Sequence, residues 1–185
     1  MKLLINEKQL QFLIREEIEM SELRRPHFNF VKEKVKQMTG QDWPEYVLLD
    51  WLYKGTKDYS ENDTPNSYRK LVKVFVEGFL YEFGPGEWKF ENLDISIDTF
   101  EPNTQTELLS RDGGSKNPYN VPNDEERHAK QSELIKKRGG PSNEPIIVVK
   151  FPNGLHLLEG WHRTIQSLKE FETYRQPAYV YYPKN

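Results

Sequence analysis

The chain has 185 residues and a net charge of −3, which suffices for one sizeable domain and gives no overall attraction to DNA or anionic lipid. Nucleic-acid binding would need a local basic patch, so we do not expect nucleic acid as a partner. The absence of cysteine excludes disulfides and cysteine nucleophiles, and no apolar run approaches the roughly 20 residues of a membrane span, which predicts a cytoplasmic protein without a membrane partner.

The first 83 residues are predicted to form a helical N-terminal region. Apolar residues recur at helical spacing over 6–23, 28–38 and 67–82, which predicts three amphipathic helices. The polar stretch from 57 to 66 predicts a loop before the third. On that third helix we expect one apolar side, made of Leu71, Val74, Phe75, Phe79 and Leu80.

A further helix is expected after Gly40, which ends the second one. Asp42 can cap it by accepting a hydrogen bond from its first turn. Its large apolar side chains indicate core packing rather than ligand binding: Trp43, Val47, Leu48, Trp51 and Leu52. The aromatic faces of these helices favour packing against the rest of the chain or a second copy, so a protein partner and a homo-oligomer both stay open.

The predicted secondary structure changes at the Gly84-Pro85-Gly86 turn. In residues 84–185 we expect strands that alternate with helices. Alternating residues predict a strand over 88–90, and 93–97 reads as an extended segment. A short helix is expected over 104–109. The chain as a whole therefore predicts an α+β fold.

An irregular loop and a charged helix come next. Two adjacent glycines in the stretch 110–118 predict the loop, because glycine accepts backbone conformations that other residues avoid. Asp124 is expected to cap the helix, which reaches about Lys137 and ends at Gly139.

The last third has the clearest pattern. A β-branched run predicts a strand over 146–151, and Asn153-Gly154 predicts a tight turn because both residues accept positive φ. Residues 155–158 return as the partner strand. Gly160 follows directly and opens a helix, and a last strand is expected over 178–182. The order is strand, turn, strand, glycine, helix, strand.

The joint at Gly160 is predicted to bind an anion. The first N–H groups of a helix lack internal partners and point outward with the positive end of its dipole. His162 and Arg163 lie in this turn, where positive side chains oppose the dipole unless an anion is bound. Arg163 can hold two phosphate oxygens, His162 can move a proton, and Glu159 can act as a base. The alternative is a solvated helix start with a surface glutamate beside it.

Three sequence segments follow the motif pattern of a known superfamily, in the same order along the chain. They are 132–139, 145–149 and 157–164. They match a polar helix ending in glycine, a "PI-V" strand with its hairpin, and "(D/E)-G-x-(H/R)-R" at the start of a helix. The stretch from about 124 to 170 thereby resembles the ParB/sulfiredoxin superfamily. Order and spacing both match, which makes the likeness more specific than one short motif.

The resemblance implies a small mixed sheet with helices that binds a nucleotide, with Mg²⁺ and ATP or CTP as cofactors. It implies phosphate contacts from Gly160, His162, Arg163 and Thr164. Glu159 and His162 become the candidate catalytic residues.

The sequence differs from the superfamily pattern in two ways, and each difference excludes or disfavours one known activity of the superfamily. Trp161 stands where sulfiredoxins have their catalytic cysteine, so sulfiredoxin activity is excluded. Partition proteins of the superfamily continue into a DNA-binding part, whereas only the short stretch 171–185 follows the motif helix here. A DNA-binding role is therefore the weakest alternative.

A second cluster is expected to close over the ligand. Arg111, Gly113 and Gly114 lie in the glycine loop, and Arg127 and His128 follow on the charged helix. The plainer interpretation is a surface loop and a solvated helix. The histidines form no metal-ligand spacing, so no metal held directly by the protein is expected.

Two classes of function remain open. One is a nucleotide-dependent hydrolase or phosphotransferase. The other is an assembly or protein-interaction module that keeps the fold. The N-terminal segment with Arg24-Arg25-Pro26 resembles the start of many tailed-phage proteins, which favours a bacteriophage protein working in the host cytoplasm.

Overall fold

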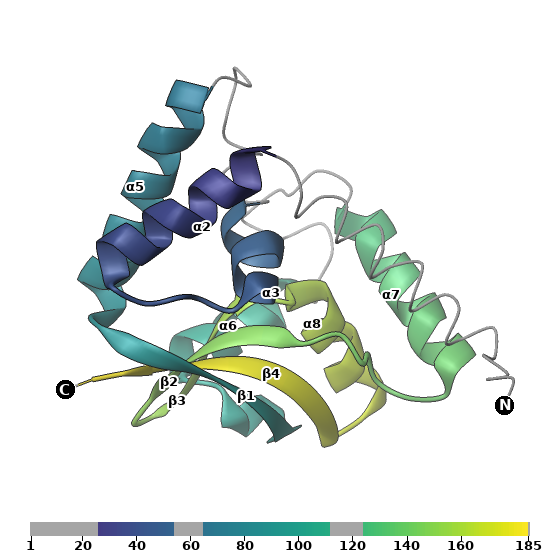
Figure 1. Ribbon diagram of the computed structural model, residues 1–185. Coiled ribbons are helices and arrows are strands. Elements are labelled where there is room, and N and C mark those ends of the chain that lie inside the picture. The colour runs from purple at the N-terminus through teal and green to yellow at the C-terminus, as the bar shows by residue number, and fades with distance from the viewer. Residues whose placement is uncertain (1–25, 54–64, 112–123, 185) are drawn as a thin grey trace, which may run out of the picture. The chain divides into compact units, whose positions relative to one another are not determined.

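The computed structural model describes residues 26–53, 65–111 and 124–184 (Figure 1). The chain divides into two compact units between Phe79 and Leu80. Helices occur in both units and a mixed sheet in the second, so the predicted α+β class is confirmed. The helix predicted over 6–23 lies outside the described residues, as do the greater parts of the two predicted loops.

The described part of the first unit is helical. It holds α2 (Pro26–Thr39), α3 (Glu45–Val47), the π-helical turn η1 (Leu48–Tyr53) and most of α5 (Pro65–Phe83). The helices predicted over 28–38 and 67–82 are therefore confirmed, with slightly wider bounds. Gly40 ends α2, as its position after the last periodic residue predicts.

The cap predicted at Asp42 is wrong. Helix α3 begins after Pro44, whose φ of −54° and ψ of 136° are those of an extended residue that precedes a helix. Asp42 instead accepts a hydrogen bond from Lys36 at 2.7 Å. This pair links the last turn of α2 to the segment that follows it.

The aromatic stripe packs as a core, as the sequence predicts. Trp43 and Trp51 stack with 6.3 Å between ring centroids. Phe79 of α5 lies edge-on to both, at 5.0 Å and 5.3 Å. Val47 and Leu52 beside them are fully buried. Such aromatic pairs stabilise a core beyond the area that they bury.

The buried side of α5 differs from the predicted one. Val72, Val76, Phe79 and Phe83 are buried, whereas Val74 is 57% exposed. Two overlapping stripes of apolar residues run along this helix, and the one that continues to Phe83 is buried. Helical spacing alone does not choose between them.

The second unit is built on a four-stranded sheet in the order β1-β4-β2-β3. Its strands are β1 (Gly86–Ile95), β2 (Ile146–Phe151), β3 (Gly154–Glu159) and β4 (Tyr174–Pro183). Strand β4 pairs antiparallel with β1 and parallel with β2, and β3 forms an antiparallel hairpin with β2. The segment predicted over 88–90 and the first part of the one predicted over 93–97 belong to one strand, which ends at Ile95, whereas Ile97 begins a 3-10 turn. The last strand begins at Tyr174 rather than at 178.

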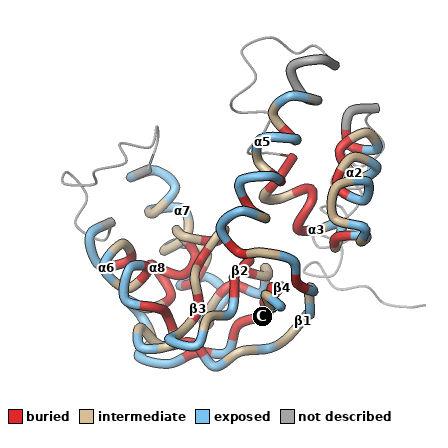
Figure 2. The backbone as a smooth tube through the Cα atoms, turned by 90° about the vertical axis from the view of Figure 1, so that its left-hand side faces the viewer, coloured by how far each residue is buried: buried red, intermediate tan, exposed pale blue. Residues whose placement is uncertain are grey.

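Helices cover one face of this sheet. The described part of the unit holds the 3-10 turn η2 (Ile97–Thr99), α6 (Pro102–Arg111), α7 (Asp124–Arg138) and α8 (Trp161–Glu170). Leu108 of α6 and Ile165 of α8 join Ile146, Val148 and Val180 of the strands in one buried core. Figure 2 colours the backbone by burial. Helix α7 packs against α8. The short helix predicted over 104–109 is thus longer at both ends.

The predicted β2–β3 hairpin is confirmed, but its turn uses different residues. Strand β3 begins at Gly154, so Pro152 and Asn153 form the turn. Proline fixes φ near −65°, which excludes the turn type that needs positive φ at both positions. The positive φ falls on Gly154, at +138°, and a Cβ there would lie 2.6 Å from backbone atoms of Phe100 and Glu101. Glycine is needed because another segment crosses it.

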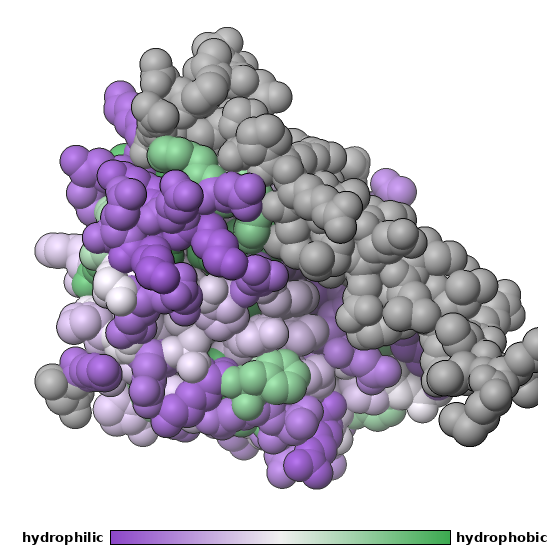
Figure 3. Space-filling view, in the orientation of Figure 1, coloured by the Kyte–Doolittle hydropathy of each residue, from purple (hydrophilic) through white to green (hydrophobic). Residues whose placement is uncertain are grey.

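The surface that Figure 3 shows is mainly hydrophilic where the structure describes it, with small and separate apolar areas. No helix of residues 26–53, 65–111 or 124–184 is long and apolar enough to cross a membrane. Scattered exposed apolar side chains are usual on folded proteins. The larger ones here are Val74, Tyr81, Phe90 and Leu109.

Candidate functional site

Gly160 forms the joint between β3 and α8. Its φ of +103° and ψ of 17° are left-handed, so the chain turns sharply from the strand into the helix. Its carbonyl accepts a hydrogen bond from the Thr164 N–H at 2.9 Å. The first turn of α8 contains no acidic residue, and Gly160 provides no side-chain cap. The positive end of the helix dipole is therefore not offset by a carboxylate within its own first turn.

Gly160→Ala is expected to lower the free energy of unfolding by about 2 kcal/mol, because it adds backbone strain and a clash. A Cβ there would lie 2.7 Å from the Ile146 side chain and 3.3 Å from the Arg163 guanidinium. Gly140→Ala is the matched control, since a Cβ at that position meets nothing within 4 Å. Urea unfolding measures both variants. Equal stabilities would contradict a strained joint.

Arg163 is directed into the protein. The residue is 8% exposed. Its Nη1 donates to Glu144 Oε2 at 2.6 Å, and its Nη2 donates to the carbonyl of Pro145 at 3.2 Å. These contacts tie α8 to the segment that enters β2. A phosphate held by both guanidinium nitrogens, as the sequence analysis expects, would have to displace the Glu144 carboxylate.

His162 meets His128 of α7 at the start of α8. The centroids of the two imidazole rings are 4.7 Å apart, and the ring planes are tilted by 56°. Gln166, one turn further along α8, places its amide nitrogen 2.9 Å from Nδ1 of His128. Both histidines are half-buried, whereas Gln166 is buried. The structure therefore brings one residue of each predicted cluster together.

Thr164 lies in the core beneath α8. It is fully buried, and the hydroxyls of Ser167 and Tyr174 are also buried. Burial raises the pKa of Tyr174 to about 12, and the neighbouring hydroxyls of Thr164 and Ser167 partly oppose this shift. The Thr164 side chain is thus directed to the interior, and its backbone N–H already donates to Gly160.

The other predicted site residues lie as follows. Glu159 is half-buried and ends β3. Arg127 has an exposed side chain on α7. Arg111 ends α6, but its side chain lies outside the described residues, as do Gly113 and Gly114. The contribution of the glycine loop therefore stays a prediction.

Within the described ranges, no three side chains of His, Asp or Glu gather closely enough to hold a metal ion. Mg²⁺ prefers several oxygen ligands in an octahedral arrangement. At this site those oxygens would come mainly from the phosphates of a bound nucleotide. The residues present thus fit Mg²⁺ only as a companion of such a ligand.

A second polar cluster, which the sequence analysis did not single out, surrounds Glu101. Its carboxylate accepts hydrogen bonds at 2.8 Å from the backbone N–H groups of Asn103 and Thr104, and at 2.7 Å from the Thr104 hydroxyl. Nδ1 of His156 lies 3.2 Å away. Burial by itself raises the pKa of Glu101, but these hydrogen bonds outweigh it, so the pKa is lowered. The cluster joins the start of α6 to β3.

The sequence around Glu101 indicates one part of this cluster, the capped start of α6. Glu101 directly precedes Pro102, and an acidic residue followed by proline at the first helical position is typical of a capped helix start. No local sequence pattern predicts the contact with His156 of β3, because this residue is 55 positions away from Glu101 along the chain.

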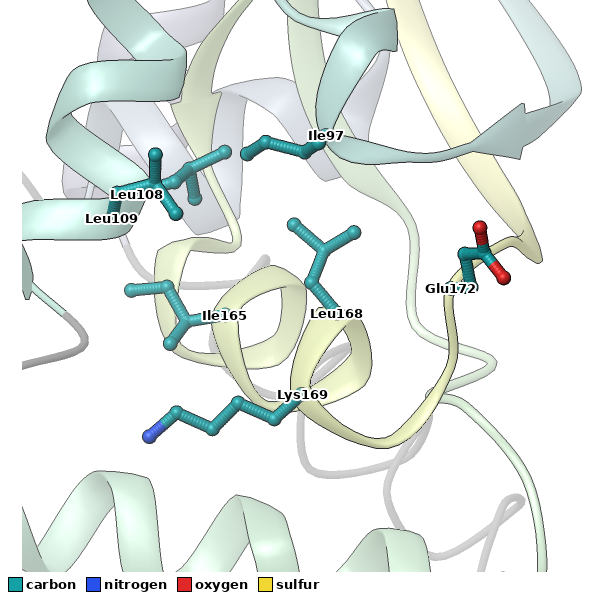
Figure 4. A pocket seen from close by; sticks show the side chains of 7 residues that line it. All are labelled: Ile97, Leu108, Leu109, Ile165, Leu168, Lys169 and Glu172. Carbon is teal, nitrogen blue, oxygen red and sulfur yellow. The ribbon is translucent and has the colours of Figure 1, made fainter.

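A small hollow of about 310 Å³ opens beside α8. Its lining is mainly apolar and consists of Ile97, Leu108, Leu109, Ile165, Leu168, Lys169 and Glu172. In Figure 4 the Leu168 side chain points toward Ile97, whose own side chain runs toward the leucines of α6, whereas Lys169 and Glu172 lie at separate margins. The hollow includes neither histidine of the α8 start, so it is separate from the candidate anion site.

No known family model matches the chain, and no curated protein or solved structure matches it either. The resemblance to the ParB/sulfiredoxin superfamily therefore rests on the motif residues alone.

Proposed function

We propose that the protein binds the phosphates of a nucleotide at the start of α8. The observation that carries this proposal is the left-handed entry into α8 beside the imidazoles of His162 and His128. A helix N-terminus attracts an anion through its first N–H groups and its dipole. Imidazole N–H groups add donors suited to phosphate oxygens.

In this proposal each residue of the motif has a distinct role. Gly160 permits the left-handed turn with which α8 begins, and His162 and His128 donate to phosphate oxygens. Arg163 acts indirectly, because its guanidinium holds the joint in place through Glu144. Mg²⁺ with ATP or CTP is the ligand that the superfamily resemblance favours.

Hydrolysis or phosphoryl transfer is the reaction class that such a site supports. Glu159 and His162 lie on either side of Gly160 and are the candidate acid and base. An imidazole titrates near neutral pH in its ordinary state, which suits this role.

A non-catalytic assembly or interaction module is the second candidate. The observation that favours it is the Arg163–Glu144 pair, since a site evolved to clamp phosphate would gain from an arginine without a carboxylate partner. Such a protein would keep the fold and perform no turnover.

Calorimetry with ATP, CTP and GTP in the presence of Mg²⁺ tests the proposal. We expect micromolar binding by the wild type and about tenfold weaker binding by His162→Ala, a loss of about 1.4 kcal/mol. Lys150→Ala is the control for general charge attraction, because it removes an exposed positive charge from β2. Phosphate release separates the two candidates, since binding without turnover supports the module. No binding by the wild type at millimolar nucleotide would refute the nucleotide site.

A further inference from the structure

Two imidazoles from different helices meet at the start of α8, and their separation is informative. The ring centroids of His128 and His162 are 4.7 Å apart with a tilt of 56°. In a zinc site the Zn–N distance is about 2.0–2.1 Å, which puts each ring centre roughly 3 Å from the ion. Two such rings at a tetrahedral angle have centres roughly 5 Å apart. The observed spacing is thus close to that of two imidazoles on one metal ion.

Gln166 supplies the neighbouring contact that a metal-bound histidine usually has. Its amide lies 2.9 Å from Nδ1 of His128. The atom nearest Nδ1 is the amide nitrogen, which donates to the Nδ1 lone pair. On metal binding at Nε2 the amide would turn over, so that its oxygen accepts from Nδ1–H. A hydrogen bond to the second ring nitrogen fixes the tautomer and orientation of metal-bound histidines. Because Gln166 is itself buried, it holds His128 in one orientation.

We propose that His128 and His162 together bind one divalent transition-metal ion, such as Zn²⁺, Co²⁺ or Ni²⁺. Imidazole nitrogen is a favoured ligand of these ions, whereas Mg²⁺ and Ca²⁺ prefer oxygen. The part of the chain that the structure describes adds no third His, Asp or Glu to this pair, so water or a ligand oxygen completes the coordination. A metal with open positions is a Lewis acid that can polarise a phosphoryl oxygen.

This proposal uses both histidines of the proposed nucleotide site but does not rest on nucleotide binding. Metal binding is measured without nucleotide, and nucleotide binding is measured with Mg²⁺ in buffer freed of transition metals. Either result can therefore fail while the other holds.

Titration of the full chain, free of any histidine tag, with Co²⁺ and Zn²⁺ tests the metal site. We expect one saturable site of micromolar affinity, with a visible Co²⁺ absorption band. His128→Gln and His162→Gln should each weaken binding by about tenfold or more. Lys130→Gln, which removes an exposed positive charge from the same helix α7, is the matched control and should change the affinity less than about twofold.

Gln166→Glu distinguishes a metal site from simple packing of the two rings, because only a metal site predicts a change in metal affinity. A carboxylate at this position accepts more strongly from Nδ1–H of His128, so the affinity for Zn²⁺ should rise about tenfold. Absence of saturable binding by the wild type up to about 1 mM metal would overturn the proposal. So would binding that both histidine variants retain in full. In those cases the two rings pack as an ordinary aromatic pair.

Discussion

Arg163→Met is expected to lower the free energy of unfolding by about 3 kcal/mol. Methionine keeps most of the apolar stem but removes the guanidinium, so the Glu144 carboxylate loses a partner that lies 2.6 Å away. The Pro145 carbonyl loses its donor as well. Removing one member of a largely buried ion pair leaves an uncompensated charge, which costs more than the pair itself contributes. Urea unfolding followed by tryptophan fluorescence measures the change.

Two variants give this measurement its controls. In the Arg163→Met background, Glu144→Gln should restore about 1 kcal/mol, because the amide carries no buried charge. Arg127→Met removes an exposed arginine and should change stability by less than about 0.5 kcal/mol. An equally small effect of Arg163→Met would contradict a structural role and would make direct phosphate binding by Arg163 the better interpretation.

This result also affects how loss of nucleotide binding is interpreted. A variant at Arg163 can lose binding because the joint at Gly160 moves, with no contact between Arg163 and ligand. His162 lies in the same turn but is half-buried rather than buried, so it reports on the ligand more directly. Nucleotide binding is therefore tested with the His162→Ala variant, and the structural role of the ion pair is tested with Arg163→Met.

The sequence predicts well where the signal is local. The order of strand, turn, strand, glycine and helix from 146 to 170 follows from β-branched residues, turn residues and helical spacing within a few positions of one another. Gly160 stands at its predicted joint, with the left-handed backbone that makes glycine necessary. The charged helix α7 spans Asp124–Arg138 and ends before Gly139, close to its expected bounds, although Asp124 is its first residue rather than a cap ahead of it.

Contacts between distant residues are what the sequence alone does not reveal. Arg163 and Glu144 are 19 residues apart, and no periodicity indicates that the arginine turns inward to this carboxylate. Five consecutive residues of α8 are buried, so this helix has no purely solvated face on which a ligand-facing residue could be assumed. Thr164 illustrates the result, since it follows the motif directly yet lies in the core. The contact between the histidines likewise depends on how α7 packs against α8.

Glu101→Ala is the second change with a large expected effect, a loss of about 3 kcal/mol at neutral pH. The variant removes the acceptor for two backbone N–H groups at the start of α6 and for the Thr104 hydroxyl. It also removes the partner of His156. The two Thr104 donors are buried, so losing their acceptor also leaves desolvated groups without compensation. The Asn103 and His156 contacts are only partly buried and contribute less. Asp98→Ala removes an exposed carboxylate nearby and should cost less than about 0.5 kcal/mol.

The same carboxylate should give stability a definite pH dependence. Because the folded pKa of Glu101 is lowered, its ionised form stabilises the fold above the ordinary glutamate pKa of about 4.3. That contribution is lost as the pH falls through the folded pKa, since the folded state must then take up a proton. Glu101→Gln keeps the shape without the charge, so the gap in unfolding free energy between wild type and variant should be constant near neutral pH. It should narrow below about pH 4.3. A gap that stays unchanged down to pH 3 would show that His156 and the α6 start do not depend on the charge of Glu101.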